Sequence, residues 1–263
     1  MRLHLIDGTY ELFRAHFSKR PDAPDKATRG LVASMLRLVS DEQVTHIAVA
    51  FDNPIRSFRN DLFDGYKTEE GVPPELLRQF DGAEAAVRAI GMTVWPMDEF
   101  EADDALATAA ARFAGEVEQV RICTPDKDLG QCIVGKKVVQ VDRMRQREID
   151  EDALIALRGI KPASIPDWLA LIGDVADGVP GLAGFGEKTA AALLARYPHL
   201  EDIPADPRQW PPVRGADRLA KTLAESRELV FLYRTLTRLR TDVPLVENLA
   251  DLAYRGTPSA TAE

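Results

Sequence analysis

The stretch FEADDALATAAARFAG, residues 100–115, places three carboxylates within four positions at the start of an alanine-rich apolar run. The run predicts a helix, and acidic side chains near a helix N-terminus accept hydrogen bonds from its free N–H groups and suit the helix dipole. One carboxylate would meet that need, whereas Glu101, Asp103 and Asp104 are three. Such crowding, in a chain whose net charge is −9, indicates a bound cation as the counter-charge.

On both sides of this stretch, the first half of the chain alternates strand-like runs with helical runs. Helical periodicity marks residues 27–41, 73–91 and 103–114. The strand-like runs are residues 2–6, 46–51, 92–97, 119–124 and 137–141. The alternation predicts an α/β domain with a mostly parallel sheet, which we assign to residues 1–150.

The strand signal fades from about Asp150 onward, and the following runs have helical periodicity. We therefore expect a second, helical domain over residues 151–250. The small and polar C-terminal sequence, which ends in GTPSATAE, predicts a disordered tail over residues 251–263.

Acidic side chains follow four of the predicted strands. In chain order they are Asp7, Asp52, the group Glu101, Asp103 and Asp104, and the pair Asp126 and Asp128. A single Asp after a strand is often only a turn or capping residue, but the carboxyl ends of parallel strands share one edge, where ligands bind. Carboxylates gathered there repel one another unless divalent cations lie among them, and oxygen ligands favour Mg²⁺ or Mn²⁺ over Zn²⁺.

Such an edge suits phosphate chemistry, because two divalent ions about 4 Å apart activate water and stabilise the leaving oxygen of a phosphodiester. Basic residues cluster in the segments after the first two strands. Each one alone is typical of a solvated surface, but as groups they are suited to hold phosphates. They are Arg14, Lys19, Arg20, Lys26 and Arg29 after the first strand, and Arg56, Arg59 and Lys67 after the second.

The second half carries one distinctive stretch, GDVADGVPGLAGFGEKTAAALLARY, residues 173–197. It is not a P-loop, because Glu187 stands where that motif needs Lys and no strand precedes it. The glycines predict instead a helix–hairpin–helix turn, whose exposed amides at the start of the next helix bind phosphate without reading base sequence. Asp174 and Asp177, three positions apart, would share a helical face and extend the metal site.

Taken together, the motifs resemble the 5′-nuclease family of flap endonucleases, bacteriophage 5′-exonucleases and the N-terminal domain of bacterial DNA polymerase I. The matching stretches occur in the family's order and cover about residues 2–195. They are LIDGTYELFRA, TRG, VAFDNPIRSFR, GYK, FEADDALA, TPDKDLGQ and GDVADGVPGLAGFGEKTA. The resemblance implies a PIN-like α/β nuclease domain followed by a helical domain that grips DNA.

The resemblance also implies roles for individual residues. The scissile-phosphate lysine falls on Lys67 and the arginine of the first helix on Arg14, and both would act in catalysis with Asp7, Asp52 and Asp103. The metal-binding acids fall on Asp7, Asp52, Glu101, Asp103, Asp104, Asp126, Asp128, Asp174 and Asp177. DNA contacts are expected at Arg29, Arg59, Gly184, Gly186, Lys188 and Thr189, with K⁺ at the hairpin GFGEKT. The chain departs from the family at Gly178, where Asn is usual, and at Glu70, where a basic residue is usual.

We therefore expect a structure-specific 5′-3′ exonuclease and 5′-flap endonuclease that hydrolyses DNA with two or more Mg²⁺ or Mn²⁺ ions in replication and repair. The alternatives are a PIN-like ribonuclease and a non-catalytic protein that binds DNA junctions. We expect a free-standing, monomeric, cytoplasmic and nucleoid-associated enzyme without membrane contact. Its DNA partners would carry 5′ ends, flaps or nicks, and a DNA polymerase and a ligase would be its functional partners.

Overall fold

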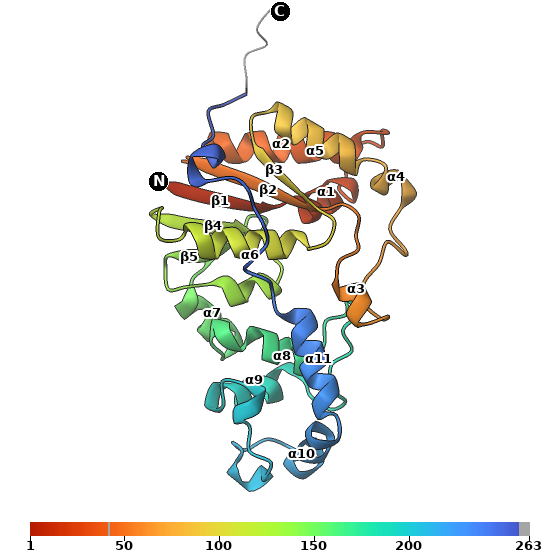
Figure 1. The fold of residues 1–263 in the computed structure, drawn as a ribbon, viewed down its shortest axis with the longest axis vertical. Helices are drawn as coiled ribbons and strands as arrows, with labels where there is room; N and C mark the ends of the chain where they lie inside the picture. Colours follow the sequence, from red (N-terminus) through yellow and green to blue (C-terminus); the bar gives the residue numbers. More distant parts are fainter. Residues whose placement is uncertain (42, 258–263) are drawn as a thin grey trace, which may run out of the picture.

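The computed structural model describes residues 1–41 and 43–257, which form an α/β part and a helical part (Figure 1). The α/β part contains a six-stranded sheet of order β3-β2-β1-β4-β5-β6. Its strands are β1 (Arg2–Asp7), β2 (His46–Asp52), β3 (Thr93–Met97), β4 (Gln119–Cys123), β5 (Val138–Asp142) and β6 (Arg147–Ile149). The mostly parallel sheet is confirmed with all five predicted strands, whereas β6, which pairs antiparallel with β5, was not predicted.

Strand β1 lies at the centre of the sheet and explains how both faces are buried. Leu5 pairs in parallel register with Ala48 on one side and with Ile122 on the other. Because side chains alternate along a strand, Leu5 packs on the α6 face while Ile6 packs on the opposite face. Burial on both faces accounts for the continuous apolar strands that the sequence shows.

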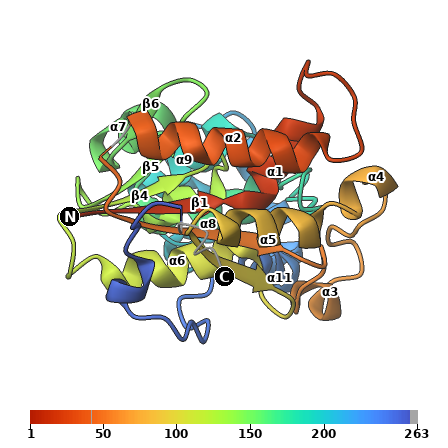
Figure 2. The same cartoon turned by 90° about the horizontal axis from the view of Figure 1, so that it is seen from above.

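Helices cover the sheet on its two faces. Helices α1 (Gly8–His16), α2 (Lys26–Asp41) and α5 (Phe80–Ala89) cover one face, and α6 (Ala102–Phe113) covers the other (Figures 1 and 2). Two short helices, α3 (Arg59–Leu62) and α4 (Pro74–Leu77), lie between β2 and α5. The helix predicted over 73–91 is therefore divided, because a turn at Arg78 and Gln79 separates α4 from α5.

The helical part has a core of its own, to which Trp168, Leu193, Leu219 and Tyr233 contribute. Asp150 caps the first of its helices by accepting a hydrogen bond from the Ala153 N–H at 2.9 Å. The helices are α7 (Glu151–Arg158), α8 (Ile165–Ile172), α9 (Glu187–Arg196), α10 (Ala216–Glu225) and α11 (Arg227–Thr237). Short 3₁₀ helices are η1 (Asp128–Cys132), η2 (Pro162–Ser164), η3 (Leu200–Asp202), η4 (Pro207–Gln209) and η5 (Leu249–Leu252).

After α11 the chain leaves the helical part and runs back along α6 (Figure 1). Leu239, Val243, Leu245 and Leu252 are buried in the same core as α6, and Ala253 pairs with His46 at the start of β2. The helical domain predicted to reach residue 250 therefore ends near residue 238. Disorder predicted from residue 251 is wrong for 251–254, because Leu252 and Tyr254 pack on the α/β core and Ala253 pairs with β2. Residues 258–263 lie outside the described residues. None of the described helices has the length and apolar character needed to cross a bilayer.

Candidate active site

The carboxylates that follow β1 and β2 are fixed by hydrogen bonds at the carboxyl edge of the sheet. Asp7 caps α1 by accepting from the Tyr10 N–H at 2.8 Å, and its other oxygen accepts from the Thr124 hydroxyl at 3.0 Å. Asp52 accepts from the Ala102 N–H at 2.7 Å. This last bond ties the start of α6 to the end of β2, so that the acids of α6 begin at the same edge.

Asp103 and Asp126 join these two residues in a group that we call the rim cluster (Asp7, Asp52, Asp103 and Asp126). Burial raises the pKa of Asp103 well above its usual value, and the negative charges of Asp126, Asp7 and Asp52 raise it further. Burial likewise raises the pKa of Asp7 to about 7, with Asp52 and Asp126 adding to the shift. The neighbouring carboxylates therefore lie close enough to oppose the ionisation of Asp103 and Asp7.

Glu101 lies beside the rim cluster, but the charged groups paired with it are cations. Its carboxylate accepts from the Ser57 hydroxyl at 2.7 Å and the Tyr66 hydroxyl at 3.2 Å, and lies 3.0 Å from the Lys67 ammonium. Burial alone would raise its pKa, but Lys67 and Arg59 outweigh that effect and lower the pKa of Glu101 to about 2. Glu101 is therefore an ionised carboxylate at neutral pH.

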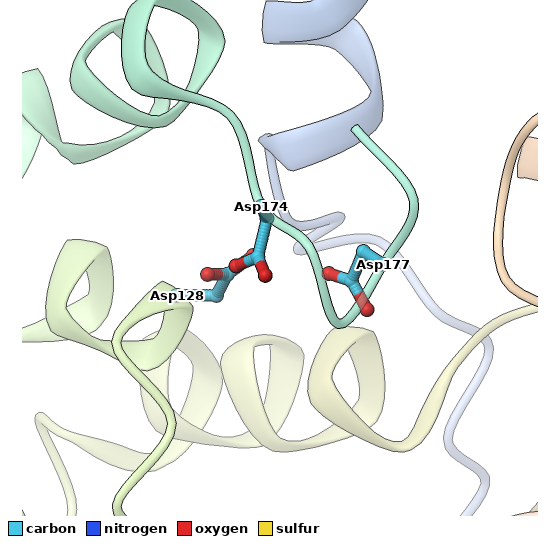
Figure 3. A group of neighbouring side chains, drawn as sticks. All are labelled: Asp128, Asp174 and Asp177. Atoms are coloured by element: carbon cyan, nitrogen blue, oxygen red, sulfur yellow. The ribbon is translucent and has the colours of Figure 1, made fainter. Parts of the chain in front are cut away.

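A second group, the loop cluster, comprises Asp128, Asp174 and Asp177, each with a carboxylate oxygen within 4.8 Å of the others (Figure 3). Asp174 lies 2.7 Å from the Lys127 ammonium, and Asp177 lies 2.9 Å from that of Lys67. One buried oxygen of Asp128, Oδ1, has no hydrogen-bond partner in the described part of the chain. Lys67 thus connects this cluster to Glu101.

The loop between α8 and α9 positions the two later acids, and this corrects the expectation that they share a helical face. Asp174 and Val179 exchange backbone hydrogen bonds of 2.7 and 2.8 Å, which close a tight loop around Asp177. Gly178 has φ +74°, and a Cβ there would lie 2.2 Å from the carbonyl oxygen of Gly65. A side chain at position 178 would therefore collide with the loop that carries Lys67, and in this chain the two loops pack this closely because the residue is glycine.

Asp104 and Arg59 do not have the roles predicted from the sequence. The Arg59 guanidinium donates to both oxygens of Asp104 at 2.7 and 2.8 Å, and both side chains are fully buried. Asp104 also accepts from the backbone N–H groups of Glu101 and Arg240, while Arg59 donates to two carbonyls at the end of α11. The assignments of Asp104 as a metal ligand and of Arg59 as a DNA contact are therefore wrong, because each already satisfies the other inside the protein.

The remaining acidic side chains are chemically suited to bind divalent cations. The donor set consists of carboxylates alone, the type of ligand that hard cations prefer. Burial raises the pKa of Asp128 well above its usual value and that of Asp177 to about 6, so ionising the full set is costly without added positive charge. The unpartnered Asp128 oxygen adds a buried acceptor that a cation would satisfy. The residues able to hold such ions are Asp7, Asp52, Glu101, Asp103, Asp126, Asp128, Asp174 and Asp177.

The glycine hairpin leads into α9 as its sequence indicated. Gly184 has φ +90°, and Gly186 precedes the first helical residue without a side-chain capping bond. The indole N–H of Trp168 donates to the Glu187 carbonyl at 3.3 Å and fixes this start against α8. Lys188 is exposed in the first turn and Thr189 is half-buried, so the uncapped amides face an open surface suited to an anion.

The two remaining basic residues on the predicted list lie on the helices above the sheet. Arg14 pairs with Glu11 and donates to the Ser34 hydroxyl at 3.0 Å, and no contact joins it to either acidic cluster in the described chain. Arg29 is 73% exposed on α2 and lies 4.0 Å from Asp25. Their roles in catalysis and DNA binding stay predictions.

Four residues that hold or balance the acids were missed by the sequence analysis, namely Ser57, Tyr66, Thr124 and Lys127. Tyr66, Thr124 and Lys127 stand inside the matched motifs GYK and TPDKDLGQ, so the motifs contained the signal. Ser57 likewise stands inside the matched motif VAFDNPIRSFR, but nothing in that motif shows that its hydroxyl supports a carboxylate 44 positions away.

A parallel sheet with buried acids at its carboxyl edge is joined here to a glycine hairpin whose exposed helix N-terminus is suited to bind phosphate. This combination defines a nuclease. The family model of the 5′-3′ exonuclease N-terminal resolvase-like domain matches residues 2–158. The model of the 5′-3′ exonuclease C-terminal SAM fold matches residues 160–260. The chain therefore belongs to the 5′-3′ exonuclease family.

Relatives include a 5′-3′ exonuclease of Aquifex aeolicus, 30% identical over 89% of this chain and 82% of that protein. DNA polymerase I of Bacillus caldotenax is 33% identical over 97% of this chain, which spans 30% of the polymerase's length. Among solved structures, the T5 D15 protein co-crystallised with metal ions has a TM-score of 0.72 at 19% identity, over 90% of this chain and 89% of that one. The T5 D15 flap endonuclease in a pseudo-enzyme–product complex with DNA and metal ions gives the same values. These two structures share the fold.

Proposed function

We propose that the protein hydrolyses DNA phosphodiesters at 5′ ends, nicks and 5′ flaps, with two or more Mg²⁺ or Mn²⁺ ions. The observation that carries this proposal is the position of Lys67, whose ammonium lies 3.0 Å from Glu101, beside the rim cluster, and 2.9 Å from Asp177 of the loop cluster. The rim cluster and Glu101 would hold ions on one side of Lys67, and the loop cluster on the other. Divalent ions so held would activate water and stabilise the leaving oxygen.

Lys67 supplies positive charge from the protein itself. Burial lowers its pKa, but Glu101 and Asp177 outweigh burial and hold the pKa of Lys67 well above its usual value. It is therefore a permanent cation at neutral pH, suited to bind a non-bridging oxygen of the scissile phosphate. Thr124 and Ser57 keep the carboxylates of Asp7 and Glu101 oriented toward the same space.

The hairpin and the start of α9 would grip the duplex through its phosphates. The amides of the first turn, with Lys188 and Thr189, offer donors that do not distinguish bases. Binding should then depend little on sequence and strongly on salt.

Four further expectations rest on the resemblance alone and stay proposals: K⁺ at the hairpin, a monomeric state, a cytoplasmic and nucleoid-associated location, and joint action with a DNA polymerase and a ligase. Replacing K⁺ by Na⁺ in a binding assay tests the first. Light scattering of the purified protein tests the second.

A cleavage assay separates this function from its alternatives. Wild type is incubated with a 5′-flap DNA and Mg²⁺, beside a matched RNA and an EDTA control, and Asp103→Asn serves as the inactive variant. Cleavage of the DNA that requires Mg²⁺ is the expected result. Cleavage of the RNA alone would favour a PIN-like ribonuclease, and binding without cleavage would favour a junction-binding protein.

A further inference from the structure

A cavity of about 610 Å³ lies between α1, α2 and the β5–β6 hairpin, on the face of the sheet opposite α6. Its lining is dominated by arginine rather than by the acids that mark the carboxyl edge. The charged residues of the lining are Arg14, Arg20, Arg37, Arg121, Arg143, Arg147, Glu11 and Glu148. Six arginines against two glutamates leave four positive charges in excess, in a chain whose net charge is −9.

The two glutamates are already engaged, which leaves part of the arginine charge open. Glu11 is 2% exposed and pairs with Arg14 and Arg143, and Glu148 pairs with Arg121. The three remaining residues are exposed, and none forms an ion pair within the described ranges. They are Arg20, Arg37 and Arg147.

This arrangement points to phosphate as the ligand. Guanidinium groups present pairs of N–H donors that match phosphate oxygens, and they stay charged at every physiological pH. Like charges gathered around one hollow destabilise the folded chain unless an anion occupies it. Glu11 also accepts from the Ser34 hydroxyl at 3.0 Å, so Arg14 and Arg143, which pair with Glu11, are held in place before a ligand arrives.

The position of the cavity connects it to the active site. Helix α1 begins directly after Asp7, and Glu11 follows one helical turn later, about 6 Å along the axis. A DNA strand carries a phosphate about every 3.4 Å along the duplex axis. Arg14, seven residues after Asp7 on the same helix, lies about 10 Å along the axis, a distance that about three successive phosphates span.

We propose that this arginine cavity is a second phosphate-binding site, which holds backbone phosphates of the nucleic acid whose scissile phosphate lies at the rim cluster. The assignment of the ligand to a nucleic acid rests on the proposed function. Inorganic phosphate and mononucleotides also carry a phosphate group that such a cavity could bind. The experiment distinguishes these ligands from a nucleic acid.

The test uses the double variant Arg37→Ala/Arg147→Ala, because both side chains are exposed and their loss leaves the core intact. Binding of a fluorescent 5′-flap DNA is measured by anisotropy in EDTA across a salt series, beside titrations with inorganic phosphate and deoxyadenosine monophosphate. The control is Arg255→Ala, an exposed arginine near the opposite edge of the sheet, since Ala253 pairs with the first residue of β2. Melting temperatures check that all three proteins are folded.

The expected result is a Kd for DNA about tenfold higher in the double variant at low salt, and a slope of log K against log [salt] reduced by about 2, one unit for each lost phosphate contact. Arg37→Lys/Arg147→Lys should restore most of the slope. Unchanged DNA affinity and slope would overturn the proposal, as would loss of mononucleotide binding alone, which would assign the cavity to a small ligand. The binding assay contains EDTA and does not depend on cleavage. DNA binding through these arginines, together with no cleavage when Mg²⁺ is supplied in the separate cleavage assay, would refute the proposed function and leave this site standing.

Discussion

Replacing Asp104 by Asn tests whether the buried pair with Arg59 is structural, as the structure shows, or catalytic. The substitution keeps the shape and one acceptor oxygen but leaves the guanidinium with Glu101, at 3.5 Å, as its nearest carboxylate. Breaking one side of a buried ion pair costs about 3–5 kcal/mol, and the retained acceptor argues for the lower end, ~3 kcal/mol. With an unfolding entropy of about 2.1 cal/mol/K for each of the 263 residues, the melting temperature should fall by about 5 °C.

The assay is urea unfolding followed by circular dichroism, combined with flap cleavage at 20 °C, well below the transition. Cleavage at saturating Mg²⁺ should stay within about tenfold of wild type, because a metal ligand is not lost. A matched control replaces both partners, as Arg59→Met/Asp104→Leu, which should recover much of the lost stability by removing both buried charges. An unchanged free energy of unfolding, together with a cleavage loss above a thousandfold, would refute this reasoning and return Asp104 to the metal ligands.

Three further predictions concern the site itself. Asp103→Asn should abolish cleavage while flap binding and the melting temperature in EDTA stay near wild type, and turnover within about tenfold of wild type would contradict it. Lys188→Ala should raise KM with little change in kcat, the result of losing uniform binding, whereas a collapse of kcat at saturating DNA would show that the residue acts in chemistry. Glu70→Arg should speed single-turnover cleavage, more at low salt, because an exposed carboxylate is replaced by a cation that attracts phosphate; equal rates across a salt series would show that Glu70 has no such influence.

A pH prediction follows from the raised carboxylate pKa values. Burial raises the pKa of Asp7 to about 7 and of Asp177 to about 6 in the metal-free protein, above their values in the unfolded chain. The folded state therefore binds more protons between pH 4 and about 7, and stability should fall as the pH rises through that range. Melting temperatures in EDTA should decrease from pH 5 to pH 8, and stabilisation by Mg²⁺ should increase over the same range. A melting temperature in EDTA that rose with pH would contradict the assignment.

The sequence predicted the sheet well because a parallel sheet buried on both faces requires continuous apolar strands, and these are visible one strand at a time. The acids at its edge were visible for a similar reason, since Asp7 and Asp52 end their strands and the other acids follow a strand within a few residues. Strand β6 was missed because it has only three residues, two of them charged.

The neighbouring residues Asp103 and Asp104 show what the local sequence could not predict, namely which side chain faces the rim cluster. Successive helical residues point about 100° apart, so one faces the rim cluster and the other faces Arg59. Which of the two faces inward depends on Arg59, 45 positions away, and on the Arg240 N–H, 136 positions away. No motif around residue 103 carries that information, and both residues were therefore predicted to be metal ligands.

The return of the chain after α11 makes the helical part an insertion within the α/β part. Because His46 pairs with Ala253, 207 positions later, this part of the α/β core is completed only after the helical part has been synthesised. Contacts so distant in sequence form slowly, since a long loop must close before they are made. A nascent chain would thus carry a complete helical part while the face of α6 that receives Leu245 and Leu252 is still exposed to solvent.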